Sequence, residues 1–457
     1  MTQSEIELDT ISARPSIGQS RSSTNDEYDS DQKFQSSQPP ANKEQFDSYP
    51  EDINSWVQVF AGAVLFGTSV GGIYCWGVFQ DALVTAGVGA SNQLTWIGST
   101  QATFQAMFAV LVGRLVAHFG ARNCALTGSV LLGAGPLLGS FCYTSLVGLA
   151  LTEGVIFGLG EALLFFASAT LPSSYFLRKR NLATGIAYSG GGIGGAALSL
   201  IVAQLLKHLS IAWTFRAYSL ILVGVSLPAA LIMKSRGPRQ PFRTEARIFD
   251  LSLFKDPSFC FLLLGTSIGV FPLFVPPFFL PLFGTSVGLA KSTSSYILAG
   301  YNLASAAGRI VFGVLGDARL GSLNSLILCL GVVSISMWAI WPFATSVPPL
   351  IAFAVVNGFC AGGMFSLIPG VVSSLFGSTR LTVVFTLLLT FWTPAYFFGS
   401  PLAGILLQAS GGEQAGIAAF RPAIFYAAGL STLACTFVSV PKLLEIKKRR
   451  KASRQEK

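Results

Sequence analysis

The sequence predicts an all-α membrane protein with twelve transmembrane helices arranged as two pseudo-symmetric six-helix bundles. Composition and an internal repeat support this prediction. Of the 457 residues, 51% are hydrophobic and only 11% are charged, whereas a water-soluble globular protein carries about 25% charged residues. The chain has too few charged side chains to cover a surface exposed to water, so its hydrophobic segments belong in a lipid bilayer.

Hydrophobic segments follow one another from Trp56 to Val440, each long enough to cross about 30 Å of hydrocarbon as a helix. They are continuous rather than alternating, which favours helices over the strands of a barrel. The predicted spans are 56–79, 94–118, 123–142, 146–170, 181–206, 213–233, 258–283, 293–316, 322–342, 348–370, 381–407 and 420–441.

Polar segments divide the chain. Residues 1–50 are rich in Ser, Gln and Asp and offer no apolar face, so we expect a disordered tail. Residues 51–233 form the first predicted bundle, 234–257 a basic linker, 258–441 the second bundle and 442–457 a basic tail.

Lysine and arginine set the predicted orientation. The turns after helices two, four, eight and ten carry six of them, and the opposite turns carry three. Since basic turns stay in the cytoplasm, the turns after helices two, four, eight and ten, the linker and both termini are predicted to be cytoplasmic. The membrane is predicted to be the plasma membrane. We expect the basic tail to contact anionic lipid rather than nucleic acid. The two sets are Arg122, Arg178, Lys179, Arg180, Arg319 and Arg380, against Lys207, Lys291 and Arg421.

Three phrases occur twice at nearly the same offset. LFGTSVGG, which begins at Leu65, returns as LLGTSIGV 198 residues later, at position 263. GRLVAHFGARN from Gly113 is echoed by GVLGDARLGSLN from Gly313, and IFGLGEALLF from Ile156 by VNGFCAGGMF from Val356, in both cases 200 residues later. Two bundles of one plan are typical of rocker-type secondary transporters, which bind substrate at mid-membrane between the bundles.

These motifs resemble those of the major facilitator superfamily. The segment from Tyr175 to Gly195, YFLRKRNLATGIAYSGGGIGG, is similar to the start of helix five in the monocarboxylate porter family of that superfamily. The sequence as a whole resembles the fungal branch of the family. NLASAAGRIVFG from Asn302 and GSPLAG from Gly399 resemble that family's helix eight and helix eleven phrases. The resemblance covers about residues 52–440. It implies the superfamily's fold and secondary active transport of a small organic anion by alternating access.

The sequence departs from the porter pattern at two ionisable positions. Tyr74 stands where the family carries a Lys in helix one, and Ser305 where it carries an Asp in helix eight. Because the family uses those groups to handle protons and carboxylate, the resemblance supports a porter without identifying its substrate.

The resemblance also implies gating residues. Asp317 matches the latch between helices eight and nine, whereas the corresponding residue of the first half is Ala117. Gly113 and Gly313 belong to the two signature turns, and the basic run Arg178, Lys179 and Arg180 is expected to anchor the cytoplasmic end of helix five.

Three charged residues fall inside predicted helices: Glu153 and Glu161 in helix four and Arg309 in helix eight. Each costs about 2.5–3.5 kcal/mol to insert, so we expect each to face a cavity or a partner. An α-helix would separate the glutamates by about 80° around its axis and about 12 Å along it. Both are candidates for proton coupling, since burial favours a protonated carboxyl group. Arg309, which matches the family's helix-eight Arg, is the first candidate for carboxylate binding; the alternative is an internal pair with Glu161.

Prolines in helices seven and eleven predict kinks or breaks, and broken helices line cavities in transporters. Aromatic residues beside these prolines predict a wall that suits a bulkier, flatter substrate than lactate, although any single ring could instead face lipid. The predicted substrate-binding residues besides Arg309 are Tyr74, Asn302, Phe274, Phe278, Trp392 and Tyr396, with Phe279 in the same wall.

Other functions are disfavoured. The sequence has no Gly-x4-Gly-Lys-Ser/Thr loop, no HExxH motif and only two histidines, so we expect neither an ATP-driven pump nor an enzyme, and no cofactor or metal. Three functions remain open: proton-coupled movement of a small organic anion or aromatic metabolite, efflux of a fungal secondary metabolite, and nutrient sensing without transport.

Overall fold

A computed structural model describes residues 52–169, 171–176, 180–234, 251–317, 320–377 and 381–455. Within these ranges every regular element is a helix, which confirms the predicted all-α class. Residues 50–457 form one compact unit. The predicted tail at 1–50 and most of the predicted linker lie outside the described residues.

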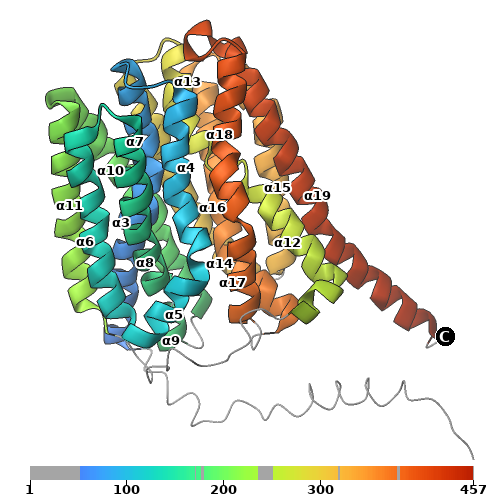
Figure 1. Ribbon diagram of the computed structural model, residues 1–457. Helices are drawn as coiled ribbons and strands as arrows, with labels where there is room; N and C mark the ends of the chain where they lie inside the picture. The colour runs from blue at the N-terminus through green and yellow to red at the C-terminus, as the bar shows by residue number, and fades with distance from the viewer. Residues whose placement is uncertain are drawn as a thin grey trace, which may run out of the picture. The chain divides into compact units, whose positions relative to one another are not determined.

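The first half of the chain packs around α3 (Ile53–Thr85) (Figure 1). α10 (Arg180–His208) runs along α3, and α11 (Ile211–Ile232) packs on α6 (Ala121–Cys142). The remaining elements of this half are α4 (Ser91–Met107), α5 (Ala109–Phe119), α7 (Leu146–Leu149), the π-helix η1 (Ala150–Ile156), α8 (Phe157–Ala169) and α9 (Leu171–Tyr175).

In the second half, α14 (Lys291–Asp317) packs along α16 (Val347–Phe376), and α12 (Pro257–Val270) along α19 (Ile417–Gln455). The two halves meet where α10 lies against α14 and α4 against α18. The remaining elements are the 3₁₀ helices η2 (Leu251–Lys255), η3 (Trp341–Phe343) and η5 (Glu413–Ala415), and the helices α13 (Val275–Ser286), α15 (Ser322–Ala339), α17 (Leu381–Phe391) and α18 (Thr393–Ala409).

Ten helical segments among the described residues are long and apolar enough to cross a membrane, so the chain is a multi-pass membrane protein. The predicted spans 94–118 and 381–407 are not among the ten, and each is broken, at Phe108 and at Trp392. The second break follows from Pro394 in the first turn of α18. The continuous helix predicted over 94–118 was wrong, because α4 ends at Met107 and α5 begins at Ala109. No proline or glycine adjoins Phe108, so the sequence did not signal this break.

The predicted break in helix seven is confirmed. Span 258–283 divides into α12 and α13, and residues 271–274 between them form a turn. Pro272 and Pro276 explain the division, because a proline has no backbone donor and clashes with the turn before it. The turn leaves Leu273 and Phe274 buried at the centre of the protein.

The repeated phrase that begins at Leu65 brings α3 into backbone contact with α10. A methyl group added to Gly71 would lie 2.5 Å from the amide nitrogen of Gly195 and 2.7 Å from the carbonyl carbon of Gly194. A side chain at this position would therefore separate the two helices. Their close packing holds Tyr74, one turn after Gly71, against the neighbouring half.

The helix ends extend beyond the predictions. Asp52 caps α3 by accepting hydrogen bonds from the amide and the hydroxyl of Ser55, both at 2.8 Å, and these bonds lower the pKa of its carboxyl group. α19 continues to Gln455, so the predicted tail at 442–457 is helical through that residue, helped by the contact of Lys442 with Glu445 at 3.1 Å.

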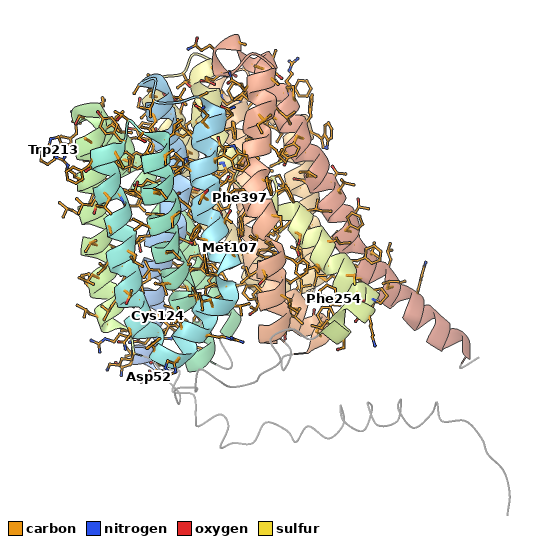
Figure 2. The ribbon with its side chains drawn as sticks, in the orientation of Figure 1. Asp52, Met107, Cys124, Trp213, Phe254 and Phe397 are labelled. Carbon is orange, nitrogen blue, oxygen red and sulfur yellow. The ribbon has the colours of Figure 1, made fainter. Side chains whose placement is uncertain are left out.

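We call the end of the protein at which α3 begins and α19 finishes the tail end, and the opposite end the far end (Figure 1). Between them, apolar side chains such as Met107 and Trp213 are exposed and point outward, as expected of a surface that meets lipid (Figure 2).

Candidate functional site

Arg309 projects from α14 into the boundary between the two halves, where it is only 1% exposed. Its Nη1 donates to the carbonyl oxygen of Tyr188 on α10 at 2.6 Å, and its Nη2 to the hydroxyl of Tyr74 on α3 at 2.9 Å. The guanidinium carbon lies 5.3 Å from the ring centre of Phe365 on α16. Nε has no hydrogen-bond partner in the described part of the chain. This buried cation therefore connects the halves, and its Nε–H is left without a partner for a further ligand to bond.

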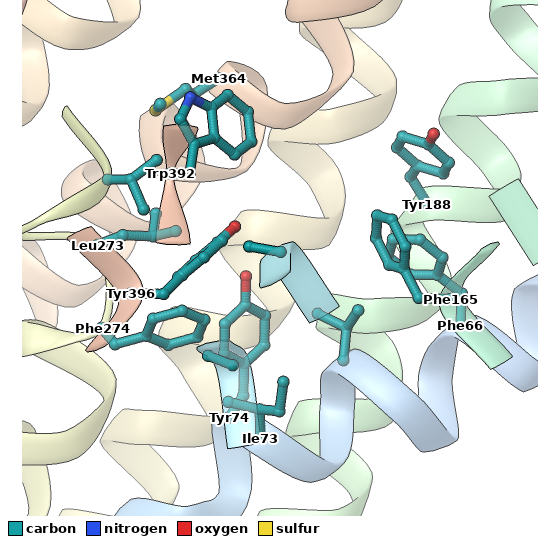
Figure 3. Close-up of a cluster of buried hydrophobic side chains, with 14 of the residues drawn as sticks. Phe66, Ile73, Tyr74, Phe165, Tyr188, Leu273, Phe274, Met364, Trp392 and Tyr396 are labelled. Carbon is teal, nitrogen blue, oxygen red and sulfur yellow. The ribbon is translucent and has the colours of Figure 1, made fainter. Parts of the chain in front are cut away.

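Aromatic rings from both halves gather in one buried cluster (Figure 3), and one of them, Tyr74, accepts a hydrogen bond from Arg309. The ring centre of Phe274 lies 5.7 Å from that of Tyr74 and 5.6 Å from that of Tyr396, and Phe274 stacks on Phe278 at 5.4 Å. Trp392 meets Tyr396 edge-on at 6.4 Å. All five rings are buried rather than turned to lipid. The structure thus brings the predicted aromatic wall together, and its role in substrate binding stays a prediction.

Asn302 lies on α14 two turns before Arg309 and is fully buried. A methyl group on Gly195 of α10 would lie 3.1 Å from both its Nδ2 and the Cβ of Tyr74. Within the described ranges neither amide atom of Asn302 has a hydrogen-bond partner. Buried amides normally form such bonds, so Asn302 offers an unused donor and an unused acceptor where the halves meet.

Glu161 on α8 is also fully buried, and neither of its carboxyl oxygens has a hydrogen-bond partner among the residues described. It lies close enough to Tyr74 and Tyr396 to interact electrostatically with both. Arg309 instead bonds Tyr74 and Tyr188, so the alternative of an internal Arg309–Glu161 pair is not present in this structure. A buried carboxyl group without a cationic partner favours its protonated form.

Glu153 lies apart from this cluster, inside the first half. It belongs to the π-helix η1, and a methyl group on Gly139 of α6 would lie 3.1 Å from its Oε1. It interacts electrostatically with the contacting pair Cys75 and Tyr218, whose Sγ and hydroxyl are 3.3 Å apart. The predicted angle of about 80° between Glu153 and Glu161 assumed a regular α-helix. It is wrong, because a π-helix bonds i to i+5 and changes the angle between successive side chains.

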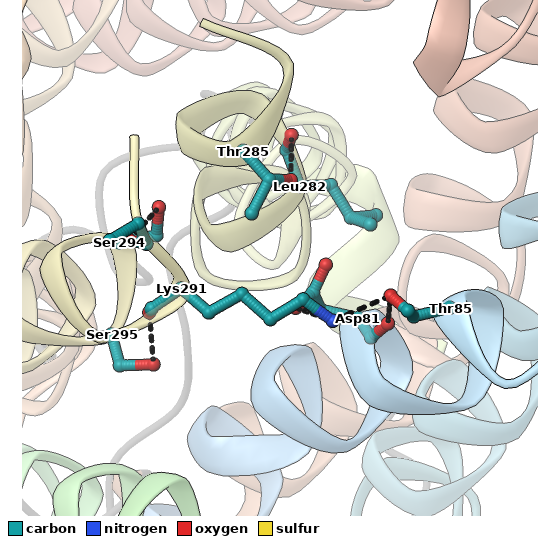
Figure 4. A network of polar contacts seen from close by, with 8 residues as sticks. Asp81, Thr85, Leu282, Thr285, Lys291, Ser294 and Ser295 are labelled. Carbon is teal, nitrogen blue, oxygen red and sulfur yellow. Dashed lines mark hydrogen bonds and ion pairs between the residues drawn. The ribbon is translucent and has the colours of Figure 1, made fainter. Parts of the chain in front are cut away.

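The far end of the boundary is held by a polar contact (Figure 4). Lys291, the first residue of α14, places its Nζ 3.6 Å from Oδ2 of Asp81 and donates to Oγ1 of Thr85 at 2.7 Å. Thr85 in turn donates to the carbonyl oxygen of Asp81 at 2.8 Å. Because Asp81 and Thr85 belong to α3, this contact, which we call the far-end latch, connects the first half to the second.

The predicted gating residues are described only in part. Arg178 and Lys179 lie outside the described residues, as do the side chains of Arg180 and Asp317. Gly113 and Gly313 are described, and a methyl group on either would meet no atom within 4 Å. Packing in this structure therefore gives no reason for glycine at these two positions.

Sequence reasoning missed several residues of the site. Tyr301 is buried one position before Asn302 and interacts electrostatically with Tyr74 and Arg309. Its position directly before the helix-eight motif, which begins at Asn302, was a signal that it shares this helix. Asp81 escaped notice because the predicted helix ended at 79, and Lys291 was predicted only as a basic residue of a turn because the next predicted helix began at 293.

The arrangement has the chemical groups to recognise a flat anion. It combines a buried guanidinium, an unused amide and an aromatic wall, and no group of three or more His, Cys, Asp or Glu that could hold a metal occurs in the described ranges. Charged and planar groups of a ligand would find complementary partners here.

Comparisons with known proteins show that the chain is similar to fungal transporters. The chain is 28% identical to the MFS-type transporter pynF of Aspergillus niger over 394 residues, which is 85% of this chain and 89% of that protein. It is 28% identical to the aspyridones efflux protein apdF of Emericella nidulans over 360 residues, 78% of this chain and 72% of that one. It is 27% identical to the agnestins efflux protein AgnL12 of Paecilomyces divaricatus over 341 residues, 74% of this chain and 78% of that one.

The family model for the Major Facilitator Superfamily matches residues 59–290 and 259–457, and so extends over both halves. These comparisons do not name the monocarboxylate porter branch, which stays a prediction. The family match and the helical architecture together show that this chain belongs to the Major Facilitator Superfamily of transporters and is not an enzyme.

Proposed function

We propose that this transporter exports a flat, acidic organic metabolite, and that protons drive the export. The observation that supports the proposal most is Arg309, a buried cation that bonds neutral partners from the other half and has no ion pair among the described residues.

The charge of Arg309 argues for an anionic substrate. A buried charge is stabilised best by an opposite charge, and its two present partners are a carbonyl and a hydroxyl. An arriving carboxylate or enolate would neutralise the guanidinium through two parallel hydrogen bonds. The bonds to Tyr74 and Tyr188 would then weaken, and since both residues belong to the first half, substrate binding would loosen the contact between the halves.

The aromatic wall and the relatives argue for a metabolite larger than lactate and for export. The guanidinium carbon of Arg309 lies 5.8 Å from the ring centre of Tyr74, and Phe274 contacts the rings of both Tyr74 and Tyr396. The relatives from Emericella nidulans and Paecilomyces divaricatus are named as efflux proteins. On this basis we assign the chain to efflux of a secondary metabolite rather than to uptake of a small carboxylate.

Glu161 is the proposed proton carrier. It is buried within electrostatic reach of Tyr74 and Tyr396, and Tyr74 accepts a hydrogen bond from Arg309. Export is coupled to protons if one conformation of the carrier favours a proton on Glu161 and the other favours an anion at Arg309. Glu153 lies among other helices and is proposed only as a secondary proton site, reached from the interior of the first half.

We further propose that the tail end faces the cytoplasm and that the carrier resides in the plasma membrane. The basic residues near the tail end support this orientation. In the opposite conformation the far-end latch would open, while Asp317 and the run Arg178 to Arg180 would help close the tail end.

Comparative metabolite profiling tests the proposal. Cells with the gene, without it, and with Arg309→Ala restored at equal surface level would be compared for compounds inside and outside. We expect one acidic aromatic compound to accumulate inside both the deletion and the Arg309→Ala cells and to appear outside only with the intact protein. Accumulation outside the deletion strain would indicate uptake instead. Unchanged profiles in all three strains would refute transport and favour a sensor.

A further inference from the structure

The second half contains a cavity that the site described above does not include. It lies behind the turn between α12 and α13, where Pro272 and Leu273 line it, and it is bounded on its other sides by α14, α15, α16 and α19. Met364 and Ala361 of α16 form part of its wall. We call it the side cavity.

The side cavity shares walls with the central site. Tyr301, which lines it, interacts electrostatically with Tyr74 and Arg309. Leu273, which also lines it, directly precedes Phe274 of the aromatic wall. Figure 3 shows Leu273 and Met364 in the same buried cluster as Tyr74, Phe274 and Tyr396. The side cavity and the aromatic wall therefore belong to the same buried cluster.

The residues that line the cavity differ from those at the matching positions of the first half. With the 200-residue offset, Phe157 of the first half corresponds to Asn357 of the second, and Glu161 to Ala361. Phe157 fills its half so tightly that a methyl group on Gly72 would lie 2.7 Å from its Cζ. In the second half, Asn357 and Ala361 instead line the side cavity. Asn357 is smaller than Phe157, and Ala361 has a methyl group where Glu161 has a carboxyl group. These two differences leave a mainly apolar space in the second half.

The lining fits a small apolar group. Two Met and two Cys side chains line the cavity, and such polarizable, adaptable groups accept ligands of varied shape. The polar lining side chains are those of Tyr301, Asn357 and Ser431. Oδ1 of Asn357 has no hydrogen-bond partner in the described part of the chain and could accept from a hydroxyl. Gly269 adds room, since a methyl group there would meet Ala434 at 3.2 Å and Met364 at 3.6 Å.

We infer that the side cavity receives a short alkyl substituent of the substrate while the acidic, flat part lies at Arg309. The transported compound is then an alkyl-substituted aromatic or heteroaromatic acid. This inference rests on the proposed function, because it requires Arg309 to hold the acidic part.

The test uses benzoate and its 4-methyl, 4-ethyl and 4-propyl derivatives as probes, with binding to the purified protein measured by calorimetry. Burying a methylene group contributes about 0.8 kcal/mol, a factor of about 4 in Kd, so propylbenzoate should bind about 50-fold more tightly than benzoate. Ala361→Leu fills the cavity and should bring that ratio close to one. Ala352→Leu, on the exposed face of the same helix, should keep it.

A second variant guards against misfolding of Ala361→Leu. Met364→Ala enlarges the cavity, so the preferred chain should become longer, and 4-pentylbenzoate should gain relative to propylbenzoate. Met107→Ala, at an outward-facing position, is its matched control and should leave the preference unchanged.

The outcomes separate this inference from the proposed function. If Arg309→Ala weakens every probe equally while Ala361→Leu and Met364→Ala leave the dependence on chain length unchanged, the side cavity is refuted and the central site stands. If no probe binds, or Arg309→Ala has no effect on any of them, the central site is refuted and this inference with it.

Discussion

Asp81→Asn removes the ionic part of the far-end latch, and its effect can be estimated from the structure. Lys291 Nζ lies 3.6 Å from Asp81 Oδ2, a separation at which two unit charges attract by about 1 kcal/mol in a water-like medium. The Lys291 side chain is 54% exposed, so screening and side-chain entropy bring the net contribution to about 0.5–1 kcal/mol. If the latch exists only when the far end is closed, its loss should raise the ratio of open to closed molecules about two- to fivefold.

Distance measurement between spin labels would detect that change. Ala86 and Ala290 are exposed at the far end, one in each half, and both would be changed to Cys in a chain whose native cysteines have been replaced. We expect Asp81→Asn to increase the population with the longer distance, and the swapped pair Asp81→Lys with Lys291→Asp to restore the shorter one. Asp256→Asn, an acid that caps α12 at the tail end, is the matched control.

Two results would refute this reasoning. The first is an unchanged distance distribution in Asp81→Asn. The second is an equal change in Asp256→Asn, which would mean that loss of any acidic group loosens the protein. High salt should reproduce part of the Asp81→Asn effect, because an exposed pair is screened.

Three further predictions concern coupling, packing and binding. Glu161→Gln should abolish the response of metabolite accumulation to an imposed pH gradient, while exchange of labelled for unlabelled metabolite continues. For one proton per substrate, that response in the unchanged protein is about tenfold per pH unit. A pH response retained by the variant in vesicles would contradict the role of Glu161. Gly71→Ala should lower the melting temperature, because its methyl group clashes with α10 and such overpacking costs about 1–3 kcal/mol. In Gly300→Ala the added methyl group would meet nothing within 4 Å, so the melting temperature should stay unchanged or rise. Equal melting temperatures in both variants would contradict the close packing. Asn302→Leu should raise the Kd of the metabolite about fivefold or more if its amide bonds the substrate, since a lost hydrogen bond with a buried partner costs about 1–3 kcal/mol. An unchanged Kd in a binding assay would remove Asn302 from the site.

The features predictable from sequence were those that a single helix determines. Arg309 and Glu161 stood out because charged residues are rare in apolar spans, and the break after Val270 followed from the backbone chemistry of Pro272 and Pro276. The π-helix around Glu153 was not predictable, because its residues also fit a regular α-helix.

Contacts between the halves could not be predicted for a different reason. The partners of Arg309 are Tyr188 and Tyr74, 121 and 235 residues away in the chain. Which residues meet across that boundary depends on how two separately packed bundles dock, and local hydropathy contains no information about it. The latch between Lys291 and Asp81 was missed on the same ground, and because both lie at helix ends that extend beyond the predicted spans.

The central claim is that one substrate-binding site, centred on Arg309, lies between the halves and is emptied across the membrane. Flux of the metabolite identified by profiling, measured in vesicles that contain the purified protein, tests it most directly. The account predicts saturable flux that Arg309→Ala abolishes and that Arg309→Lys, which keeps the charge without the planar fork, reduces at least tenfold. Flux at the normal rate in both variants would contradict it.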